Sequence, residues 1–177
     1  MNTRFAFTLM MLLVAAQAAP CSIVGFQPFI PEVDRFKPKY DRDGSNERLP
    51  TPVPKLIGVQ RGSTGAGASC SDAGIVQVEL GWPQDSAYRI EEVGFYFRVV
   101  SVHGINDIFP AEPIIGTRVR NRFVFAWLDG HPSEQRAVDI RVEVFAVNNG
   151  LQIGPSAYFE IKAAPGEVRG PQLVPTG

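Results

Sequence analysis

The sequence predicts an all-β domain in which about seven antiparallel strands form a two-layer sandwich. Apolar and polar residues alternate with a period of two along most of the chain, and turn-forming residues separate these runs. The chain also has 15 Pro and 17 Gly among its 177 residues, which favours many turns over long helices. A chain of this length is sufficient for one hydrophobic core, so we expect one globular domain.

Seven short runs rich in β-branched and aromatic residues are the expected strands. In chain order they are LIGVQ (56–60), IVQVELGW (75–82), VGFYFRVVSV (93–102), IIGTRVR (114–120), FVFAWL (123–128), VDIRVEVFAV (138–147) and AYFEIK (157–162). The stretches between them, such as GSTGAGASCSDAG and NNGLQIGPS, are rich in turn formers. Strands at this spacing are typical of an immunoglobulin-like sandwich.

The first 18 residues are expected to be a secretory signal peptide. An apolar run from Phe5 to Ala16 follows a single charge at Arg4, and Ala16 and Ala18 have the spacing of a cleavage site. No stretch of the chain approaches the ~20 apolar residues of a membrane-spanning helix, so we expect a soluble periplasmic or secreted protein with no transmembrane segment. A lipoprotein anchored at Cys21 is a weaker alternative, because a proline precedes that cysteine.

The rest of the chain divides into three parts. Residues 19–51 form a Pro-rich extended segment, because Pro28, Pro31 and Pro38 forbid a continuous helix. Its first half is too apolar for a solvated linker, so we expect it to lie along the domain. Residues 52–163 form the sandwich, and residues 164–177 a flexible tail.

Cysteine content and charge give two further expectations. In an exported chain Cys21 and Cys70 are expected to form a disulfide, with two free thiols as the alternative. A disulfide between them would close a loop of about 50 residues, which stabilises a fold by about 4 kcal/mol in the chain-entropy model. Without Arg4 the chain has 17 − 1 = 16 basic and 18 acidic residues, a net charge of −2. This balance indicates no nucleic-acid partner.

Several motifs resemble those of fibronectin type III domains. LPTPVPKLIGV resembles the opening of that module, and VQVELGWP resembles its second strand, with Trp82 as the core tryptophan. VGFYFRVV looks like its third strand, with Phe95, Phe97 and Val99 facing inward, and IRVEVFAVNNGLQIGPS resembles its penultimate strand and final hairpin. The resemblance covers residues 52–162 and implies the same sandwich. It departs at Ile140, where the family has a tyrosine.

Alternation along two strands predicts a binding surface. If Phe95 and Phe97 face the core, their neighbours in sequence face outward, and the same holds along the run 138–147. The outward side chains and the tip of the following hairpin form the predicted site: Tyr96, Arg98, Phe145, Val147, Asn148, Asn149 and Leu151. In the alternative, the apolar extension from Ile23 to Phe36 covers this patch.

No catalytic residue, cofactor or metal site is predicted. The histidines, His103 and His131, stand in turns, and the glycine-rich stretch 62–70 precedes a strand and not the helix of a phosphate-binding loop. Asp41 to Glu47 places oxygen donors of the kind that bind Ca²⁺ close together, but its glycine comes too early for an EF-hand loop, so a hydrated turn is the preferred interpretation.

These observations predict an exported, non-catalytic binding or structural module of the cell envelope with a protein or glycan partner. The alternative is a carbohydrate-binding accessory, or a subunit of a periplasmic enzyme or envelope complex. A sugar site needs exposed aromatic rings, for which Trp127, Tyr88 and Tyr158 are candidates, although Trp127 is expected to pack inside.

Overall fold

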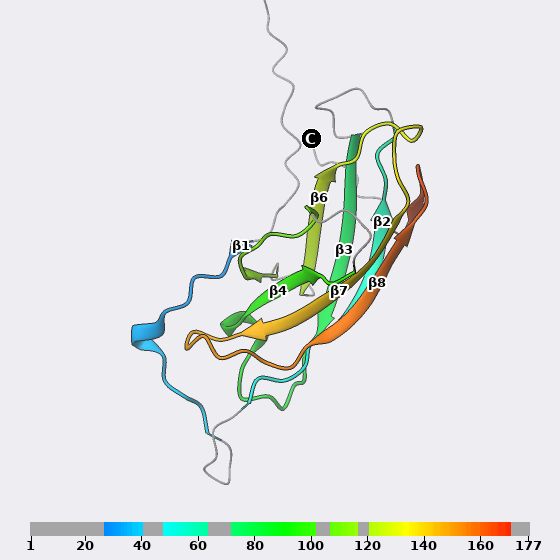
Figure 1. Ribbon diagram of the computed structural model, residues 1–177. Helices are drawn as coiled ribbons and strands as arrows, with labels where there is room; N and C mark the ends of the chain where they lie inside the picture. Colours follow the sequence, from blue (N-terminus) through cyan, green and yellow to red (C-terminus); the bar gives the residue numbers. More distant parts are fainter. Residues whose placement is uncertain (1–26, 41–47, 64–71, 102–106, 117–120, 171–177) are drawn as a thin grey trace, which may run out of the picture.

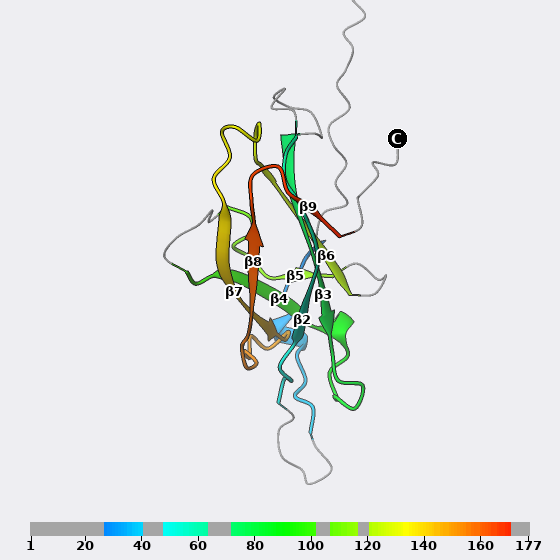
Figure 2. The same cartoon turned by 90° about the vertical axis from the view of Figure 1, so that its right-hand side faces the viewer.

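The computed structural model describes residues 27–40, 48–63, 72–101, 107–116 and 121–170, which form two antiparallel sheets (Figure 1). One sheet has five strands in the order β1-β5-β4-β7-β8, and the other has four in the order β6-β3-β2-β9. The strands are β1 (Gln27–Pro28), β2 (Val53–Gln60), β3 (Ala73–Gly81), β4 (Gly94–Val99), β5 (Ile114–Ile115), β6 (Arg122–Leu128), β7 (Val138–Val147), β8 (Ala157–Ala163) and β9 (Val168–Arg169). Figure 2 shows the two sheets as separate layers.

The all-β prediction is confirmed. The described ranges contain no α-helix; their helical residues are two 3-10 turns, η1 (Val33–Arg35) and η3 (Ile90–Glu92), and Asp72, which also has 3-10 conformation. Each of the seven predicted runs contains a strand, although IIGTRVR contributes only Ile114–Ile115 among the residues described. The structure adds β1 and β9, two-residue strands too short to produce a periodic pattern.

Aromatic rings from both sheets meet in the core. Phe97 of β4 lies 4.9 Å from Phe125 of β6 and 5.0 Å from Phe123, centroid to centroid, and Phe95 lies 5.7 Å from Phe123. Edge-to-face contacts at these distances stabilise a core beyond the area that they bury. Val142, Val144 and Ala146 of β7 are also buried in this cluster, as the alternation predicts. Trp127 is buried, and Trp82 packs against the core with its indole N–H donated to the carbonyl oxygen of Tyr88.

Residues 27–40, called the arm here, pass along one end of the five-stranded sheet (Figure 1). β1 pairs with β5, and the Phe29 backbone N–H donates to the Pro113 carbonyl oxygen at 2.8 Å. Phe29 is buried against Gly94, and Phe36 is half-buried against Gly150; a methyl group on either glycine would approach the ring to within 2.6 Å. The arm therefore depends on glycine at two positions of the sandwich.

Alanine at Gly94 is expected to undock the arm while leaving the sandwich folded. The new methyl group would meet the Phe29 ring at 2.5 Å, and overpacking of this kind typically costs 1–3 kcal/mol. We expect trypsin to cut at Arg35 about tenfold faster, since 1.4 kcal/mol corresponds to a factor of ten. Gly81→Ala is the matched control, because its nearest neighbour, Val53 Cβ, lies 3.3 Å away. Unchanged cleavage in Gly94→Ala would contradict this packing.

A buried ion pair closes the opposite end of the sandwich. Arg61, directly after β2, donates Nε to Asp129 Oδ2 at 2.7 Å and Nη2 to Oδ1 at 2.8 Å. The same guanidinium donates to the carbonyl oxygens of Arg136 and Ala163, and the Trp127 indole N–H donates to Asp129 at 3.1 Å. This arrangement joins the ends of β2, β6 and β8.

Several predicted features lie outside the described residues. They are the signal peptide (1–18), Cys21 and Cys70 of the proposed disulfide, and Asp41 to Glu47. Of the predicted tail, Val168 and Arg169 form β9, which pairs with Gln60 and Val59 of β2.

Candidate functional site

The candidate site is the surface of the five-stranded sheet that faces away from the core, called the outer face here. β4 and β7 pair in the register Tyr96 to Phe145 and Arg98 to Glu143, so these four side chains share that face. The rings of Tyr96 and Phe145 stack with centroids 5.1 Å apart, and the Arg98 guanidinium lies 5.6 Å from the Phe145 centroid. Phe145 is buried by this stack although it points away from the core.

Glu143 is a buried carboxylate on the outer face with three side-chain donors. Its Oε1 accepts hydrogen bonds from Ser156 Oγ at 2.7 Å and from the Tyr158 hydroxyl at 3.1 Å, and its Oε2 accepts one from Arg98 Nε at 2.9 Å. The Ser156 hydrogen bond, followed by those of Arg98 and Tyr158, holds the pKa of Glu143 below its usual value despite burial. These bonds hold β4, β7 and the start of β8 in a fixed arrangement.

The Glu143 carboxylate should make stability depend on pH at the acid end. Because its folded pKa is lowered, Glu143 stabilises the fold above the unfolded pKa of about 4.3, and this contribution is lost as pH falls through the folded value. We expect the free energy of unfolding to fall between pH 5 and pH 3 in the unsubstituted chain, and to fall less in Glu143→Gln. Urea denaturation at each pH measures the difference. The matched control is Glu112→Gln, at an exposed carboxyl. An equal reduction in both variants would contradict the role of Glu143.

Beyond Glu143 the outer face becomes charged. The Arg141 guanidinium lies over the Tyr158 ring at 4.6 Å, and Glu160 is the register partner of Arg141 on β8. Lys162 forms a 2.9 Å ion pair with Glu160, which lowers the pKa of that carboxyl. Opposite charges alternate here, so this part of the face selects no highly charged partner.

The hairpin tip between β7 and β8 is held in place by Asn148, a predicted ligand. Asn148 Oδ1 accepts the backbone N–H groups of Gly150 and Gln152, both at 3.0 Å, and its Nδ2 donates to the Tyr88 hydroxyl at 3.3 Å. The side chain is buried, so it shapes the tip and presents no group to a partner. Asn149 accepts the Glu32 backbone N–H at 3.1 Å and so ties the arm to the tip.

Leu151 occupies the exposed end of this tip. Its backbone has φ +60°, a left-handed conformation that favours glycine or asparagine. Its side chain is 57% exposed, and that of Ile153, which bridges to Val147, is 66% exposed.

The structure brings the predicted site residues together but exposes only some of them. Tyr96, Arg98, Asn149 and Leu151 reach the surface, whereas Phe145, Val147 and Asn148 are buried. Alternation gives the correct face for Phe145 and Val147, but not their exposure. Phe29 of the arm lies against Gly94, the register partner of Val147, so the arm covers this end of the outer face.

Other exposed apolar side chains near the tip are not among the predicted site residues. Ile30 and Val33 of the arm flank Glu32, whose N–H binds Asn149, and both are exposed. Their position depends on the path of the arm, which follows no periodic pattern. The sequence predicts Tyr158 only as a candidate sugar-stacking ring, whereas in the structure its hydroxyl donates to Glu143.

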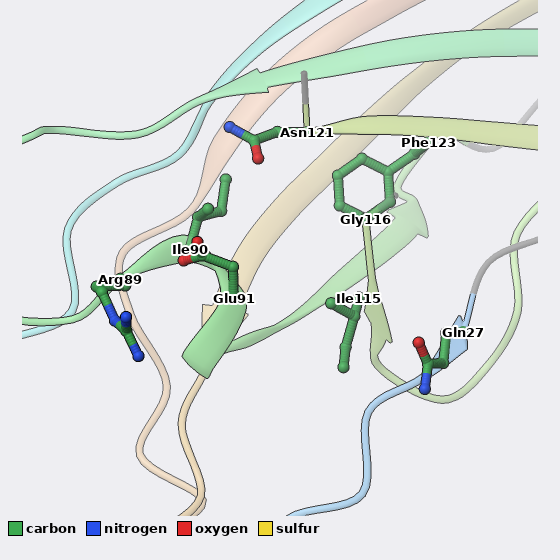
Figure 3. Close-up of a pocket in the computed structure, with 8 residues that line it drawn as sticks. All are labelled: Gln27, Arg89, Ile90, Glu91, Ile115, Gly116, Asn121 and Phe123. Carbon is green, nitrogen blue, oxygen red and sulfur yellow. The ribbon is translucent and has the colours of Figure 1, made fainter. Parts of the chain in front are cut away.

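A cleft of about 590 Å³ lies between the two sheets on their β5 and β6 sides (Figure 3). Its described lining combines apolar Ile90, Ile115 and Phe123 with the polar side chains of Gln27, Arg89, Glu91 and Asn121. None of these residues belongs to the predicted site.

Across the part of the chain that the structure describes, no three His, Cys, Asp or Glu side chains are grouped to hold a metal ion. In the same residues, no helix has the length and apolar character required to span a bilayer. His131 is exposed in its turn, with Nδ1 2.7 Å from Ser133 Oγ. Comparisons with protein-family models, curated proteins and solved structures find no match.

Proposed function

We propose that this chain is an exported, non-catalytic immunoglobulin-like module that binds a protein partner in the cell envelope. Of the strands matching the seven predicted runs, the first, second and fifth lie in one sheet and the other four in the second. This order supports the immunoglobulin-like assignment and, with the sequence motifs, the resemblance to fibronectin type III domains. The apolar run ahead of Ala18 supports export.

The proposed binding role rests on the left-handed backbone and the exposed side chain of Leu151. A non-glycine residue in left-handed backbone costs on the order of 1 kcal/mol, and an exposed leucine recovers little of it by burial. The tip around Leu151 is rigid, because Asn148 satisfies two of its backbone N–H groups. A strained, rigid and apolar tip beside exposed Ile153 is suited to burial against another protein.

The aromatic side chains favour a protein partner over a glycan. Sugar rings stack on open aromatic faces, but arginine guanidinium groups lie over Phe145 and Tyr158. Trp127 and Tyr88, the other candidate rings, are buried. Retention of the chain on a glycan array would favour the carbohydrate-binding alternative, provided that Leu151 and Ile153 stay accessible to solvent when the glycan is bound.

Site-specific photocrosslinking in cells tests this proposal. We expect a photoreactive residue at Leu151 or Ile153 to capture one protein of defined mass. Val53 and Leu128, which belong to the other sheet and are 62% and 80% exposed, are matched control positions. Equal capture at the control positions, or none at the tip, would overturn the proposal.

Leu151→Asn should separate stability from binding. Asparagine tolerates the left-handed conformation better than leucine, so we expect the free energy of unfolding to rise by up to about 1 kcal/mol. The same variant should reduce capture by a photoreactive residue at Ile153. Urea denaturation and crosslinking yield measure the two effects. A less stable variant would contradict the strain assigned to Leu151, and unchanged yield would contradict its role in binding.

A further inference from the structure

We propose that β8 is an interaction surface through which two copies of this chain pair edge to edge. β8 is the last strand of the five-stranded sheet, on the side of the molecule that faces the viewer in Figure 2. Among the strands that the structure describes, only β7 pairs with it. The other edge of β8 is available to a further strand, which would extend the sheet from one molecule into the next.

The direction of the backbone groups on β8 follows from the bonds of Arg141 on β7. The Arg141 carbonyl oxygen accepts the Val100 N–H at 2.9 Å, and the Arg141 N–H donates to Ser101 Oγ at 3.3 Å. Both partners directly follow β4, so Arg141 uses its two backbone groups on the β4 side. Because hydrogen-bonded and non-hydrogen-bonded pairs alternate in an antiparallel sheet, its register partner Glu160 directs both backbone groups away from β7.

The same alternation turns the backbone groups of Tyr158 and Lys162 toward the open edge. The Lys162 carbonyl oxygen accepts Arg169 Nη2 at 3.0 Å, and it has a second lone pair for another donor. The side chains of Tyr158, Glu160 and Lys162 are exposed. An incoming strand would therefore meet hydrogen-bonding groups on alternate residues of β8.

The charges on this edge favour a second copy of the same strand as the partner. Glu160 and Lys162 lie two residues apart and so share one face of β8. A twofold axis at Ile161 places Glu160 of each chain opposite Lys162 of the other, which makes two opposite-charge pairs across the interface. The 2.9 Å ion pair that these side chains form within one chain is exposed, so its exchange for the intermolecular pairs costs little.

The neighbouring registers lack this complementarity. A twofold axis at Glu160 sets two carboxylates directly opposite each other, which is destabilising, and an axis at Phe159 pairs Glu160 with Tyr158 and gains no ion pair. Charged side chains on an edge strand commonly prevent unspecific pairing. On β8 their order admits a second copy in one register, whereas a strand of uniform charge would meet a like charge at Glu160 or at Lys162.

The test is a charge exchange in the full chain, with the oligomeric state measured by analytical ultracentrifugation. We expect a concentration-dependent dimer that Glu160→Lys or Lys162→Glu weakens about tenfold, because each variant places like charges opposite each other. An equimolar mixture of the two variants should restore the dimer, since one edge is then positive and the other negative. The matched control is Glu112→Lys, at an exposed carboxyl outside β8, which should dimerise as the unsubstituted chain does.

Amide hydrogen exchange locates the interface. The N–H groups of Glu160 and Lys162 should exchange more slowly as the chain concentration rises. Three results would each overturn the proposal: an unsubstituted chain that stays monomeric at its highest soluble concentration, a dimer that neither charge variant weakens, and a mixture that does not restore the dimer. The pairing uses no residue of the hairpin tip, so dimerisation and capture at Leu151 can fail independently.

Discussion

Arg61→Met is expected to lower the free energy of unfolding by about 3–5 kcal/mol. The substitution leaves the buried Asp129 carboxylate without its guanidinium partner and removes donors from the carbonyl oxygens of Arg136 and Ala163. A buried charge that loses its partner keeps the cost of leaving water without the compensating attraction. Urea denaturation followed by tryptophan fluorescence measures the change, because the Trp127 indole donates to Asp129.

Two variants define the control for this experiment. Lys162→Met removes a cation from an exposed ion pair and should change stability by less than about 1 kcal/mol. Arg61→Met combined with Asp129→Leu removes both buried charges and should recover part of the loss. If Arg61→Met is no more destabilising than Lys162→Met, the buried pair does not hold this end of the sandwich together.

Phe97→Ala is expected to lower the free energy of unfolding by a similar amount, about 3–5 kcal/mol. Phe97 contacts Phe123 and Phe125 of β6 as well as Phe109 and Phe159, so its loss opens a cavity between the sheets. Neighbouring side chains fill such a cavity only in part, which adds to the lost transfer free energy.

Phe97→Leu provides the matched comparison, because leucine keeps most of the volume and should cost about 1–2 kcal/mol. Chemical denaturation of both variants under the same conditions measures their free energies of unfolding. Equal losses for leucine and alanine would show that ring contacts, and not cavity volume, dominate at this position.

The sheets could be predicted from the sequence because period-two alternation follows directly from strand geometry. Phe95, Phe97, Val142 and Val144 lie in the core as their spacing predicts. The alternation also gives the correct face for Phe145 on β7. Its burial depends on Tyr96 and Arg98, which lie across the strand pair and not beside it in sequence.

The remaining features depend on contacts between residues far apart in the chain. Nothing near Arg61 in the sequence identifies Asp129 as its partner, and no local pattern places Phe29 against Gly94. The sequence predicts Asn148 as a ligand because asparagine in a turn offers hydrogen bonds. The turn itself uses those bonds, as Asx side chains commonly do in tight turns.

The sequence therefore predicts which residues share this face better than it predicts which of them are exposed. The outer face and hairpin tip contain Tyr96, Arg98, Asn149 and Leu151, which remain accessible. Ile30 and Ile153 extend the exposed apolar surface at the same end. The cleft beside β5 and β6 has no sequence signal, because Gln27, Glu91 and Asn121 are far apart in the chain.

The arm also determines how the domain responds to mechanical force. A pull on the chain ahead of Gln27 reaches the two-residue β1 first, then Phe29 at Gly94 and Phe36 at Gly150, and only afterwards β2. We expect these attachments to open one after another under such a pull, because they lie in series along the chain, whereas the paired strands of the two sheets share their load. In that case the arm lengthens before the sheets separate.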